Sequence, residues 1–343
     1  MNLKLAEFCA KIKSENNLRG NMKIGNTEIK HGLMLAPMAG FTDRAMRLVC
    51  HKYGSEYSVS EMVSAKAVCF KDKKTHALAR LMTDEGPCAV QIFGSEPDIM
   101  ARAAETLAEG EEGGVPPIAI DINMGCPVAK VFTNGEGSAL MRNPDLIYRI
   151  VKAVSKSVSI PTTVKIRAGV DKESVNAVEC ALAAEAGGAA MVAVHGRTRV
   201  DMYSGKADME IIKKVKQSLH IPVIANGDIT SGADALTALS KTGADGIMIG
   251  RGAIGNPFLF SEIRSALSGE AFTPPSIEER IDTALLQLSL AIEEKGEGIA
   301  VREARKQIAL YLRSFKGAAL IRAEINRAET YAEVERAMRS ALQ

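Results

Sequence analysis

Residues 162–196 read TTVKIRAGVDKESVNAVECALAAEAGGAAMVAVHG, and this stretch decides the fold. It begins and ends with short runs rich in β-branched and apolar residues, at 162–167 and 191–196. Between them, apolar residues recur at intervals of three and four from Lys172 to Ala186, which is the period of a helix. A strand, a helix and a second strand in this order indicate a right-handed βαβ unit with parallel strands.

The same alternation continues along most of the chain. Helix-like segments such as Pro144–Ser157 and Ala207–Ser218 separate eight β-rich runs: 32–38, 57–62, 88–93, 118–124, 162–167, 191–196, 222–228 and 246–251. Eight βα units over roughly 240 residues are typical of a TIM barrel. A doubly wound open sheet is the competing fold, but no Rossmann-type glycine fingerprint opens a first βα turn. We therefore predict an α/β protein with a (β/α)8 TIM barrel.

The C-terminal part has a different pattern. After Pro257 the β-rich runs cease and the periodicity is helical. Pro274-Pro275, then Ser276 and Glu279, predict a loop followed by a capped helix. We expect three parts: an N-terminal extension over 1–22, a barrel over 23–259 and a smaller helical domain over 260–343.

The composition indicates a globular protein with reduced thiols. The 343 residues are 46% hydrophobic and 24% charged, with a formal net charge of +2, so a nucleic-acid-binding role would need a local basic patch. The six cysteines form no Cys-x-x-Cys pair, which disfavours a disulfide framework or a zinc site, and we expect no metal. No apolar run approaches the ~20 residues that cross a bilayer, and the N-terminus lacks a secretory pattern. We expect a cytoplasmic protein without membrane contact.

Functional side chains follow most of the predicted strands. The βα loops of a barrel converge at the C-terminal ends of its strands and carry its chemistry. The residues at these ends are Pro37, Met38, Ala39, Glu61, Gln91, Asn123, Cys126, Lys165, Arg167, His195, Arg197, Asn226, Gly227, Asp228, Gly250 and Arg251. A structural barrel would need only capping residues there, so this convergence predicts an active site.

The last two strands predict a phosphate site. ANGDI (225–229) and GIMIGRG (246–252) each place glycine just beyond a strand, where backbone N–H groups can approach an anion. The loops after strands seven and eight are the usual phosphate site of these barrels, and Arg251 would add a charge-assisted contact. Either loop alone would be read as a tight turn; both together favour a phosphate-bearing cofactor.

Three further residues have open alternatives. Lys165 could form a Schiff base, hold a phosphate, face an anionic cofactor ring, or pair with a buried carboxylate such as Asp121. Gln91 both donates and accepts, which suits a mixed polar edge, although a single glutamine is weak support. His195 is as readily a core histidine bonded to a neighbouring loop as a site residue.

Eight motifs lie along the chain: APMAGFTD (36–43), VQIFG (90–94), DINMGCPVAKV (121–131), GEGSAL (135–140), VKIRAG (164–169), VHGRTR (194–199), ANGDI (225–229) and IGRGAIGNP (249–257). Taken together, these motifs resemble those of the tRNA-dihydrouridine synthases, most closely the bacterial B-type branch. They occur in order over about residues 22 to 325. The resemblance implies an FMN-dependent (β/α)8 enzyme with a C-terminal helical domain, which uses NADPH or NADH and acts on tRNA.

The resemblance also implies roles for the residues at the strand ends. Pro37, Met38 and Ala39 would line the flavin ring, Gln91 would bond its pyrimidine edge and Lys165 would face it. The ribityl phosphate would be held by Asn226, Gly227, Asp228, Gly250 and Arg251. Cys126 matches the proton donor, and Asn123 and His195 match positions near flavin or substrate base. Val170 and Met209 stand where the family often has tryptophan, of which this chain has none.

A thiol suits the chemistry that the resemblance implies. Reduction of the C5–C6 bond of uracil needs a hydride at C6 and a proton at C5. A thiol with its ordinary pKa of ~8.5 is protonated at neutral pH, whereas a carboxylic acid is normally ionised. We therefore expect Cys126 to act as general acid, with a pKa that is not strongly depressed. Lys130, Arg167 and Arg197 are unranked candidates for stabilising the enolate or binding phosphate.

The helical domain offers a basic surface for RNA. Residues 302–327 contain seven basic and two acidic side chains. If 300–316 is one helix, Arg302, Arg305, Lys306, Arg313 and Lys316 fall within an arc of ~100°, which suits phosphate contacts. A solvated helix face is the alternative. Arg302 and Lys306 are our candidate tRNA contacts; the sequence identifies no protein partner and leaves the oligomeric state, monomer included, open.

Two other functions compete with this one. An FMN barrel that reduces a free pyrimidine or enone would share the phosphate site but would not need a basic helical appendage. A catalytically silent RNA-binding barrel would use Cys126 for packing and would carry no flavin.

Overall fold

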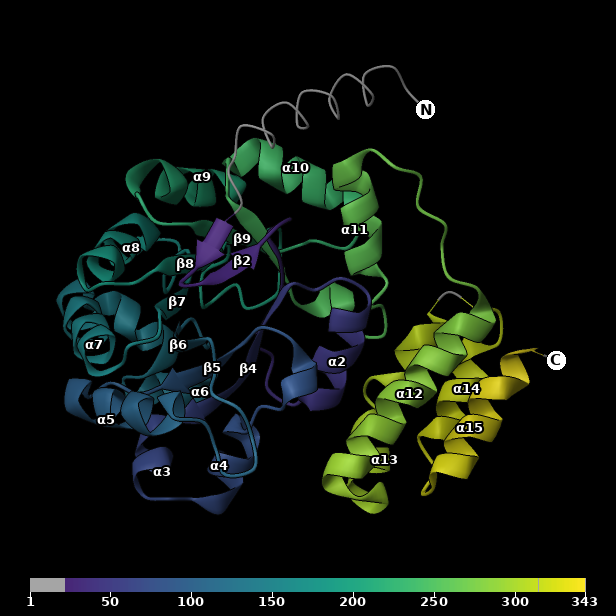
Figure 1. Cartoon of the computed structure of the whole chain (residues 1–343). Helices are drawn as coiled ribbons and strands as arrows, with labels where there is room; N and C mark the ends of the chain where they lie inside the picture. Colours follow the sequence, from purple (N-terminus) through teal and green to yellow (C-terminus); the bar gives the residue numbers. More distant parts are fainter. Residues whose placement is uncertain (1–21, 314, 343) are drawn as a thin grey trace.

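The computed structural model describes residues 22–313 and 315–342. Eight parallel strands close into a barrel in the order β10-β3-β4-β5-β6-β7-β8-β9, with helices outside it (Figure 1). This confirms the predicted TIM barrel. The barrel strands are β3 (Leu33–Leu35), β4 (Tyr57–Ser64), β5 (Cys88–Phe93), β6 (Ala119–Met124), β7 (Thr162–Arg167), β8 (Met191–His195), β9 (Val223–Asn226) and β10 (Gly246–Ile249).

Helices cover the outside of the barrel between successive strands. They bury apolar side chains such as Met100, Ile150 and Ile212 against the outward faces of the strands. The helices of this layer are α2 (Arg44–Lys52), α3 (Ala65–Cys69), α4 (Lys73–Ala79), α5 (Pro97–Ala108), α6 (Ala129–Thr133), α7 (Pro144–Ser157), α8 (Ala177–Ala186), α9 (Met209–Ser218), α10 (Gly232–Thr242) and α11 (Leu259–Ser268). Short 3-10 helices complete the connections: η1 (Thr83–Glu85), η2 (Gly137–Arg142) and η3 (Arg251–Ala253).

The predicted helices differ in how well their starts agree with the structure. The helix predicted over Pro144–Ser157 is α7 with the same bounds, and Asn143 caps it by accepting from the N–H of Leu146. The helix predicted from Lys172 begins only at Ala177 as α8. A short bridge between Gly169 and Val175 holds the preceding residues in a loop instead. The loop after β7 is therefore longer than the periodicity indicates.

A hairpin closes the N-terminal end of the barrel. Strands β1 (Met22–Ile24) and β2 (Thr27–Ile29) pair antiparallel. Their side chains Met22, Ile24 and Ile29 pack against inward-facing residues of the barrel, among them Met34 and Tyr57. Because this end is filled, the C-terminal ends of the strands are left to form a cavity. Apart from Met22, the predicted extension over 1–22 lies outside the described residues.

The C-terminal helices have a core of their own. It is formed by α12 (Ile277–Lys295), α13 (Glu297–Ala304), η4 (Ile308–Leu312), α14 (Ala318–Ile325) and α15 (Tyr331–Arg339), followed by η5 (Ser340–Leu342). Figure 1 shows these helices as a bundle beside α2. Ser276 caps α12 by accepting from the N–H of Glu279 at 3.1 Å, at the predicted position. The buried side chains of α11, including Leu259 and Ile263, belong instead to the barrel core. We therefore propose a domain boundary in the loop 269–276 rather than at 260.

One predicted element is wrong. Residues 300–316 do not form a single helix, because α13 ends at Ala304, residues 305–307 turn, and η4 follows. The turn brings η4 against the barrel at Gly255, where a Cβ atom would lie 2.5 Å from the Cβ of Leu310. Arg305 then points its guanidinium to the carbonyl oxygen of Ala328 at 2.7 Å. The tertiary contact of η4 with the barrel outweighs the local helical pattern.

An ion-pair chain joins the bundle to the barrel. Lys295, the last residue of α12, donates to Asp43 at 2.6 Å and to Glu303 at 2.8 Å. Asp43 caps α2, directly after the β3–α2 loop. Within the described ranges, no helix combines the length and apolarity needed to span a membrane.

Candidate active site

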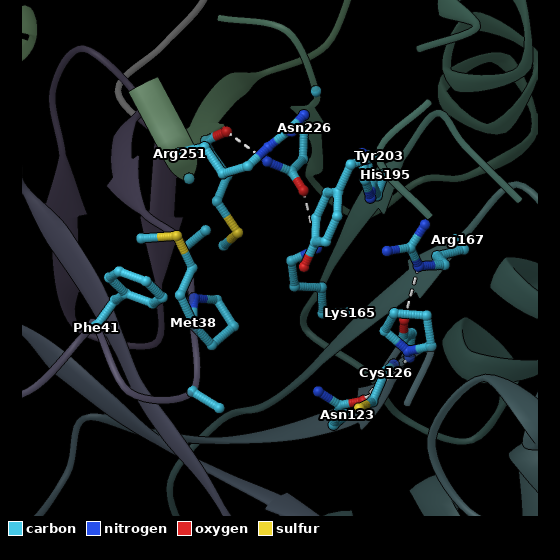
Figure 2. Close-up of a pocket in the computed structure, with 18 of the residues that line it drawn as sticks. Met38, Phe41, Asn123, Cys126, Lys165, Arg167, His195, Tyr203, Asn226 and Arg251 are labelled. Atoms are coloured by element: carbon cyan, nitrogen blue, oxygen red, sulfur yellow. Dashed lines mark hydrogen bonds between the residues drawn. The ribbon is translucent and has the colours of Figure 1, made fainter. Parts of the chain in front are cut away.

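A cavity of about 530 Å³ lies at the C-terminal ends of the barrel strands. Figure 2 shows Met38 and Phe41 on one wall and Asn123, Cys126 and Arg167 on the other, with Lys165 and Asn226 between them. The predicted site residues that line it are Pro37, Met38, Ala39, Gln91, Asn123, Cys126, Lys165, Arg167, His195, Asn226, Gly227, Asp228, Gly250 and Arg251. The structure thus brings together residues separated by more than two hundred positions in sequence.

The β3–α2 loop forms the first wall. The hydroxyl of Thr42 accepts from the N–H of Met38 at 3.0 Å and donates to the carbonyl of Ala36 at 2.9 Å. The N–H of Gly40 donates to the carboxylate of Glu61, a residue within β4. Burial raises the pKa of Glu61 above its usual value, while this hydrogen bond opposes the shift. These contacts fix the loop that presents Pro37, Met38 and Ala39 to the cavity.

A hydrogen-bonded chain crosses the floor of the cavity. Asp121 accepts from the hydroxyl of Thr163 at 2.5 Å and from the side-chain amide of Gln91 at 2.7 Å. The carbonyl oxygen of Gln91 accepts from the amide of Asn123 at 2.8 Å. Gln91 is fully buried, and these bonds hold its amide in one orientation. One N–H and one lone pair of Gln91 remain for a ligand.

Asn123 shapes the loop that carries the thiol. Its side-chain oxygen accepts from the backbone N–H groups of Gly125 at 3.1 Å and Cys126 at 2.9 Å. The carbonyl of Cys126 accepts from the hydroxyl of Ser138 at 2.7 Å. Gly137 has φ +59°, and a Cβ there would lie 3.0 Å from the Cβ of Cys126, so glycine is required at this close approach.

Cys126 is a cavity residue with a protonated thiol. It is 8% exposed and lines the cavity rather than the apolar core. Burial raises its pKa above the ordinary value, although the N–H of Val128 and the charge of Arg167 act in the opposite direction. This agrees with the expectation of a pKa that is not depressed. The Cys126 thiol therefore keeps its proton at neutral pH and can donate it.

Lys165 lies in the middle of the cavity floor. Its ammonium donates to the side-chain oxygen of Asn226 at 2.9 Å, and Asn226 donates in turn to the carbonyl of Met248 at 2.7 Å. Burial lowers the pKa of Lys165 to about 7, with a further contribution from Arg167, while Asp121 acts in the opposite direction. The alternative of an ion pair with Asp121 is not observed, since the contacts of Asp121 are with Gln91 and Thr163. An anion in the cavity would restore the charge of Lys165.

His195 is a neutral imidazole. Burial, together with the neighbouring cations Lys165, Arg167 and Arg197, lowers its pKa to about 2. Its Nε2 lies 3.5 Å from a guanidinium nitrogen of Arg197. It lines the cavity as an uncharged ring whose Nε2 faces Arg197, which can only donate.

Two arginines, Arg167 and Arg197, use their side chains to hold the loops that form the cavity wall. Arg167 donates to the carbonyl oxygens of Gly125 at 2.7 Å and Thr198 at 2.9 Å, and burial lowers its pKa to about 10. Arg197 is 3% exposed, does not line the cavity and donates to both carboxylate oxygens of Asp228 at 2.7 and 2.9 Å. We expected Arg197 to contact the substrate directly. In the structure it lies behind the cavity wall, where it holds Asp228.

The loops after β9 and β10 form the last wall. Gly227 has φ +131°, and a Cβ there would lie 2.5 Å from the Cβ of Ala207. Asp228 adopts φ +53°, in the left-handed region; burial would raise the pKa of its carboxyl, but hydrogen bonds from the N–H of Ala207 and from Arg197 lower it. The carboxylate of Asp228 thus faces Arg197, which leaves its backbone N–H as the group that could contact an anion. Arg251 is half exposed at the mouth, with its guanidinium 4.5 Å from the ring centre of Tyr203.

Sequence reasoning missed several residues of the cavity. Phe41, Met62, Met202 and Tyr203 line it, and Tyr203 is 52% exposed at the mouth. An aromatic residue within the polar loop 196–208 was the signal available for Tyr203. Arg302 and Lys306 do not line the cavity; both are exposed on the C-terminal bundle. In the part of the chain that the structure describes, no group of three or more His, Cys, Asp or Glu side chains could hold a metal ion.

Comparisons with known proteins agree with this geometry. The family model described as dihydrouridine synthase (Dus) matches residues 34–343. A protein of Shewanella oneidensis named tRNA-dihydrouridine synthase B is 43% identical over 313 residues, covering 91% of this chain and 95% of that one. A protein of Rickettsia conorii named probable tRNA-dihydrouridine synthase is 42% identical over 307 residues, covering 89% and 91%.

A solved structure supports the fold at greater distance. Histamine dehydrogenase from Rhizobium sp. 4-9 superposes with a TM-score of 0.55 at 13% identity, covering 80% of this chain and 51% of that one. That likeness concerns the fold alone. The family model and the two relatives, by contrast, span nearly the whole chain, and they confirm the resemblance drawn from the motifs. The chain belongs to the dihydrouridine synthase family.

Proposed function

We propose that this protein reduces the C5–C6 double bond of specific uridines in tRNA to 5,6-dihydrouridine, with FMN as its cofactor and NADPH or NADH as the electron donor. The observation that carries the proposal is the pairing of a protonated thiol, Cys126, with an amine of lowered pKa, Lys165, in one cavity of a family member. The thiol of Cys126 is suited to donate a proton, and the amine of Lys165 is suited to face an anionic ring.

The cavity fits a flavin nucleotide. Its volume of about 530 Å³ falls within the range of cofactor sites. Gln91 keeps a free donor and acceptor for a pyrimidine edge, and Pro37, Met38 and Ala39 offer an apolar surface for a ring. The phosphate would be held by the backbone of Gly227, Asp228 and Gly250 and by Arg251, with Asn226 acting through Lys165. Arg251 is half exposed, so it is suited to contact the solvent-exposed phosphate end of such a ligand.

The chemistry divides between cofactor and thiol. When bound, the reduced flavin supplies the hydride that C6 of the uracil accepts. The electrons of the double bond then rest on the uracil as an enolate, and C5 takes the proton of the Cys126 thiol. Arg167 lies between the carbonyls of the two loops that flank the thiol, so it fixes their spacing. His195 stays neutral at working pH and serves as a hydrogen-bonding group, not as the acid.

The substrate must enter as an extruded nucleotide. A uracil stacked in a folded RNA cannot reach the floor of a barrel, so the nucleotide has to flip out of its stack. The exposed Arg302 and Lys306 suit phosphate contacts with the remainder of the tRNA. Arg305 is better assigned to the structure of the bundle, because it binds the carbonyl of Ala328.

The test uses two half-reactions of the purified, flavin-loaded protein. NADPH should bleach the absorption near ~450 nm that a bound flavin gives. Unmodified tRNA should then restore it rapidly, and free uridine should not. Restoration by free uridine or an enone, with tRNA inactive, would favour the small-molecule reductase. Cys126→Ala should still be reduced by NADPH but should reoxidise slowly with tRNA; failure of the reduction step itself would remove Cys126 from the donor role.

A further inference from the structure

Two arginines share one aromatic ring, and none of the three residues lines the cavity itself. The guanidinium carbon of Arg199 lies 3.8 Å from the ring centre of Phe132, and that of Arg142 lies 4.6 Å from it. Phe132 belongs to α6, Arg142 ends η2, and Arg199 belongs to the loop after β8. The two guanidinium groups can be no farther apart than the sum of these distances. Three segments of the chain therefore converge to hold two like charges close together.

Neither arginine has an acidic partner in the part of the chain that the structure describes. Among residues 22–313 and 315–342, no carboxylate pairs with Arg142 or Arg199, and neither side chain donates a hydrogen bond. The Nε of Arg199 is buried without a partner. Like charges repel, and the ring of Phe132 attracts both of them. A bound anion would satisfy the free N–H groups and remove the repulsion.

The position of the pair points to the substrate. The N–H of Phe132 donates to the carbonyl of Val128, and the N–H of Met202 donates to the carbonyl of Arg199. Val128 and Met202 both line the cavity, so Phe132 and Arg199 each lie one backbone turn from a wall residue, and Arg142 joins them through the ring of Phe132. The loops involved follow β6 and β8, on the part of the barrel ring away from β3 and the α2 surface that packs on the C-terminal bundle.

We propose that Arg142, Phe132 and Arg199 form a phosphate clamp for the RNA strand beside the nucleotide that enters the cavity. The inference rests on the proposed function, since it takes tRNA as the substrate. Phe132 orients the two guanidinium planes, and their free N–H groups grip backbone phosphate oxygens. With the C-terminal bundle gripping the RNA from the other side of the cavity, the clamp holds the extruded nucleotide at a fixed distance from Cys126.

The test compares three variants of the flavin-loaded protein. Arg142→Gln removes one unpaired charge, and Phe132→Leu keeps both charges but removes the ring. Arg80→Gln is the matched control. Arg80 is exposed and caps the C-terminus of α4, next to the bridge between Leu81 and Val115. Because this segment leads into the start of β5, Arg80 lies at the end of the barrel opposite to the cavity. Binding of unmodified tRNA is measured over a range of salt concentrations, with melting temperature and flavin content as checks on folding.

We expect Arg142→Gln to raise the Kd for tRNA several-fold and to lower the slope of log K against log salt by about 0.7–0.9, the value of one phosphate contact. Phe132→Leu should raise the Kd with a smaller change of slope, and Arg80→Gln should change neither. Wild-type Kd and slope in Arg142→Gln, or a slower tRNA half-reaction at unchanged Kd, would overturn the clamp.

The reductive half-reaction tests whether the arginine pair binds a phosphate of NADPH instead of a phosphate of RNA. The 2′-phosphate of NADPH offers the same chemistry as RNA phosphate, so the rate of flavin reduction is measured against NADPH concentration in each variant. A raised half-saturation for NADPH at unchanged tRNA affinity would overturn the RNA assignment. If the wild-type protein bound no tRNA at all, the proposed function would fail, which is a different result from a selective loss in Arg142→Gln.

Discussion

The side-chain oxygen of Asn123 accepts a hydrogen bond from the backbone N–H of Cys126 at 2.9 Å. The same amide donates to Gln91, which donates to Asp121 on the neighbouring strand. The loop that carries the thiol is thus tied to two barrel strands and to the group that we assign to the flavin edge. Asn123 thus positions the loop of Cys126 and the amide of Gln91, and because it also lines the cavity, its predicted place beside the substrate base stays a prediction.

Asn123→Ala should separate positioning from proton donation. It leaves the N–H of Cys126 and the carbonyl of Gln91 without partners, each at a cost of about 1–3 kcal/mol when buried. We expect a lower free energy of unfolding and tRNA-driven reoxidation slowed by about tenfold or more, because misplacement of a reacting group by about 1 Å has effects of that order. Stopped-flow absorbance measures the rate, and NADPH reduction should persist.

The matched control for this variant is Asn143→Ala. Asn143 also uses its side-chain oxygen to accept a backbone N–H, that of Leu146 at 3.0 Å, but at the start of α7 outside the cavity. Loss of this cap should cost about 1 kcal/mol of stability and leave tRNA-driven reoxidation unchanged. If both variants slowed reoxidation equally, general destabilisation would explain the effect and the positioning role would be rejected.

The raised pKa of Cys126 predicts the pH dependence of the same step. The acid form donates the proton, and burial keeps the thiol protonated above its ordinary range. Reoxidation by tRNA should therefore be independent of pH through neutrality and should decline only as alkaline pH ionises the thiol. The thiol should also react slowly with iodoacetamide at pH 7, as the thiolate is the nucleophile. Rapid alkylation at neutral pH, or a rate that falls below pH 7, would contradict the assignment.

The lowered pKa of Lys165 predicts how the flavin-free protein responds to pH. In the unfolded chain this amine keeps its proton up to its usual pKa near 10.5, whereas in the folded protein it loses it at about 7. Between these values the unfolded state binds more protons, so this group makes stability rise with pH through that window. Below pH 7 both states are protonated and the cost of burying the charge is fully present.

Lys165→Met should remove that rise. Urea unfolding of flavin-free protein at pH 7 and pH 9 measures it, with Lys156→Met on the outer surface of α7 as a control that keeps the wild-type pH dependence. Bound FMN should also flatten the wild-type profile, because an anionic ligand beside Lys165 favours its protonated form. An unchanged difference between pH 7 and pH 9 in Lys165→Met would show that the amine is not desolvated.

The sequence predicted the barrel because its pattern is local. The runs at 88–93 and 162–167 coincide with β5 and β7, since β-branched residues bounded by turn signals need no distant contact to be recognised. Most of the residues expected at strand ends line one cavity, although Glu61 and Arg197 do not, because parallel strands in a barrel present their C-terminal ends at one face. The order of the strands around the barrel then determines which of these residues lie next to each other.

What the sequence did not predict depends on distant contacts. Whether Arg197 faces the cavity or its wall is decided by Asp228, which comes from the next loop. The helix expected over 300–316 is broken by the contact of η4 with the barrel and by a network with α12, in which Tyr311 donates to Gln287 at 2.6 Å and Gln287 donates to Gln307 at 2.8 Å. Such a buried network outweighs helical periodicity and has no local sequence signal.

The corrected geometry of the C-terminal bundle separates its basic residues into two classes. Arg302 and Lys306 are exposed, and in the described part of the chain no carboxylate pairs with either. Arg305 is half-buried and holds the carbonyl of Ala328. We therefore expect Arg302→Glu with Lys306→Glu to weaken tRNA binding and lower its salt dependence by roughly the value of two contacts, without a change in melting temperature.

Arg305→Gln should behave in the opposite way. It removes a hydrogen bond between the turn after α13 and the carbonyl of Ala328, so the melting temperature should fall by a few degrees while the salt slope of tRNA binding stays at its wild-type value. Fluorescence anisotropy of labelled tRNA across salt concentrations measures the slopes, with Arg80→Glu as the control for charge reversal away from the bundle. Equal slopes in the double variant and the wild type would show that the RNA lies elsewhere, whereas a lowered slope in Arg305→Gln would restore the single basic stripe that the sequence suggested.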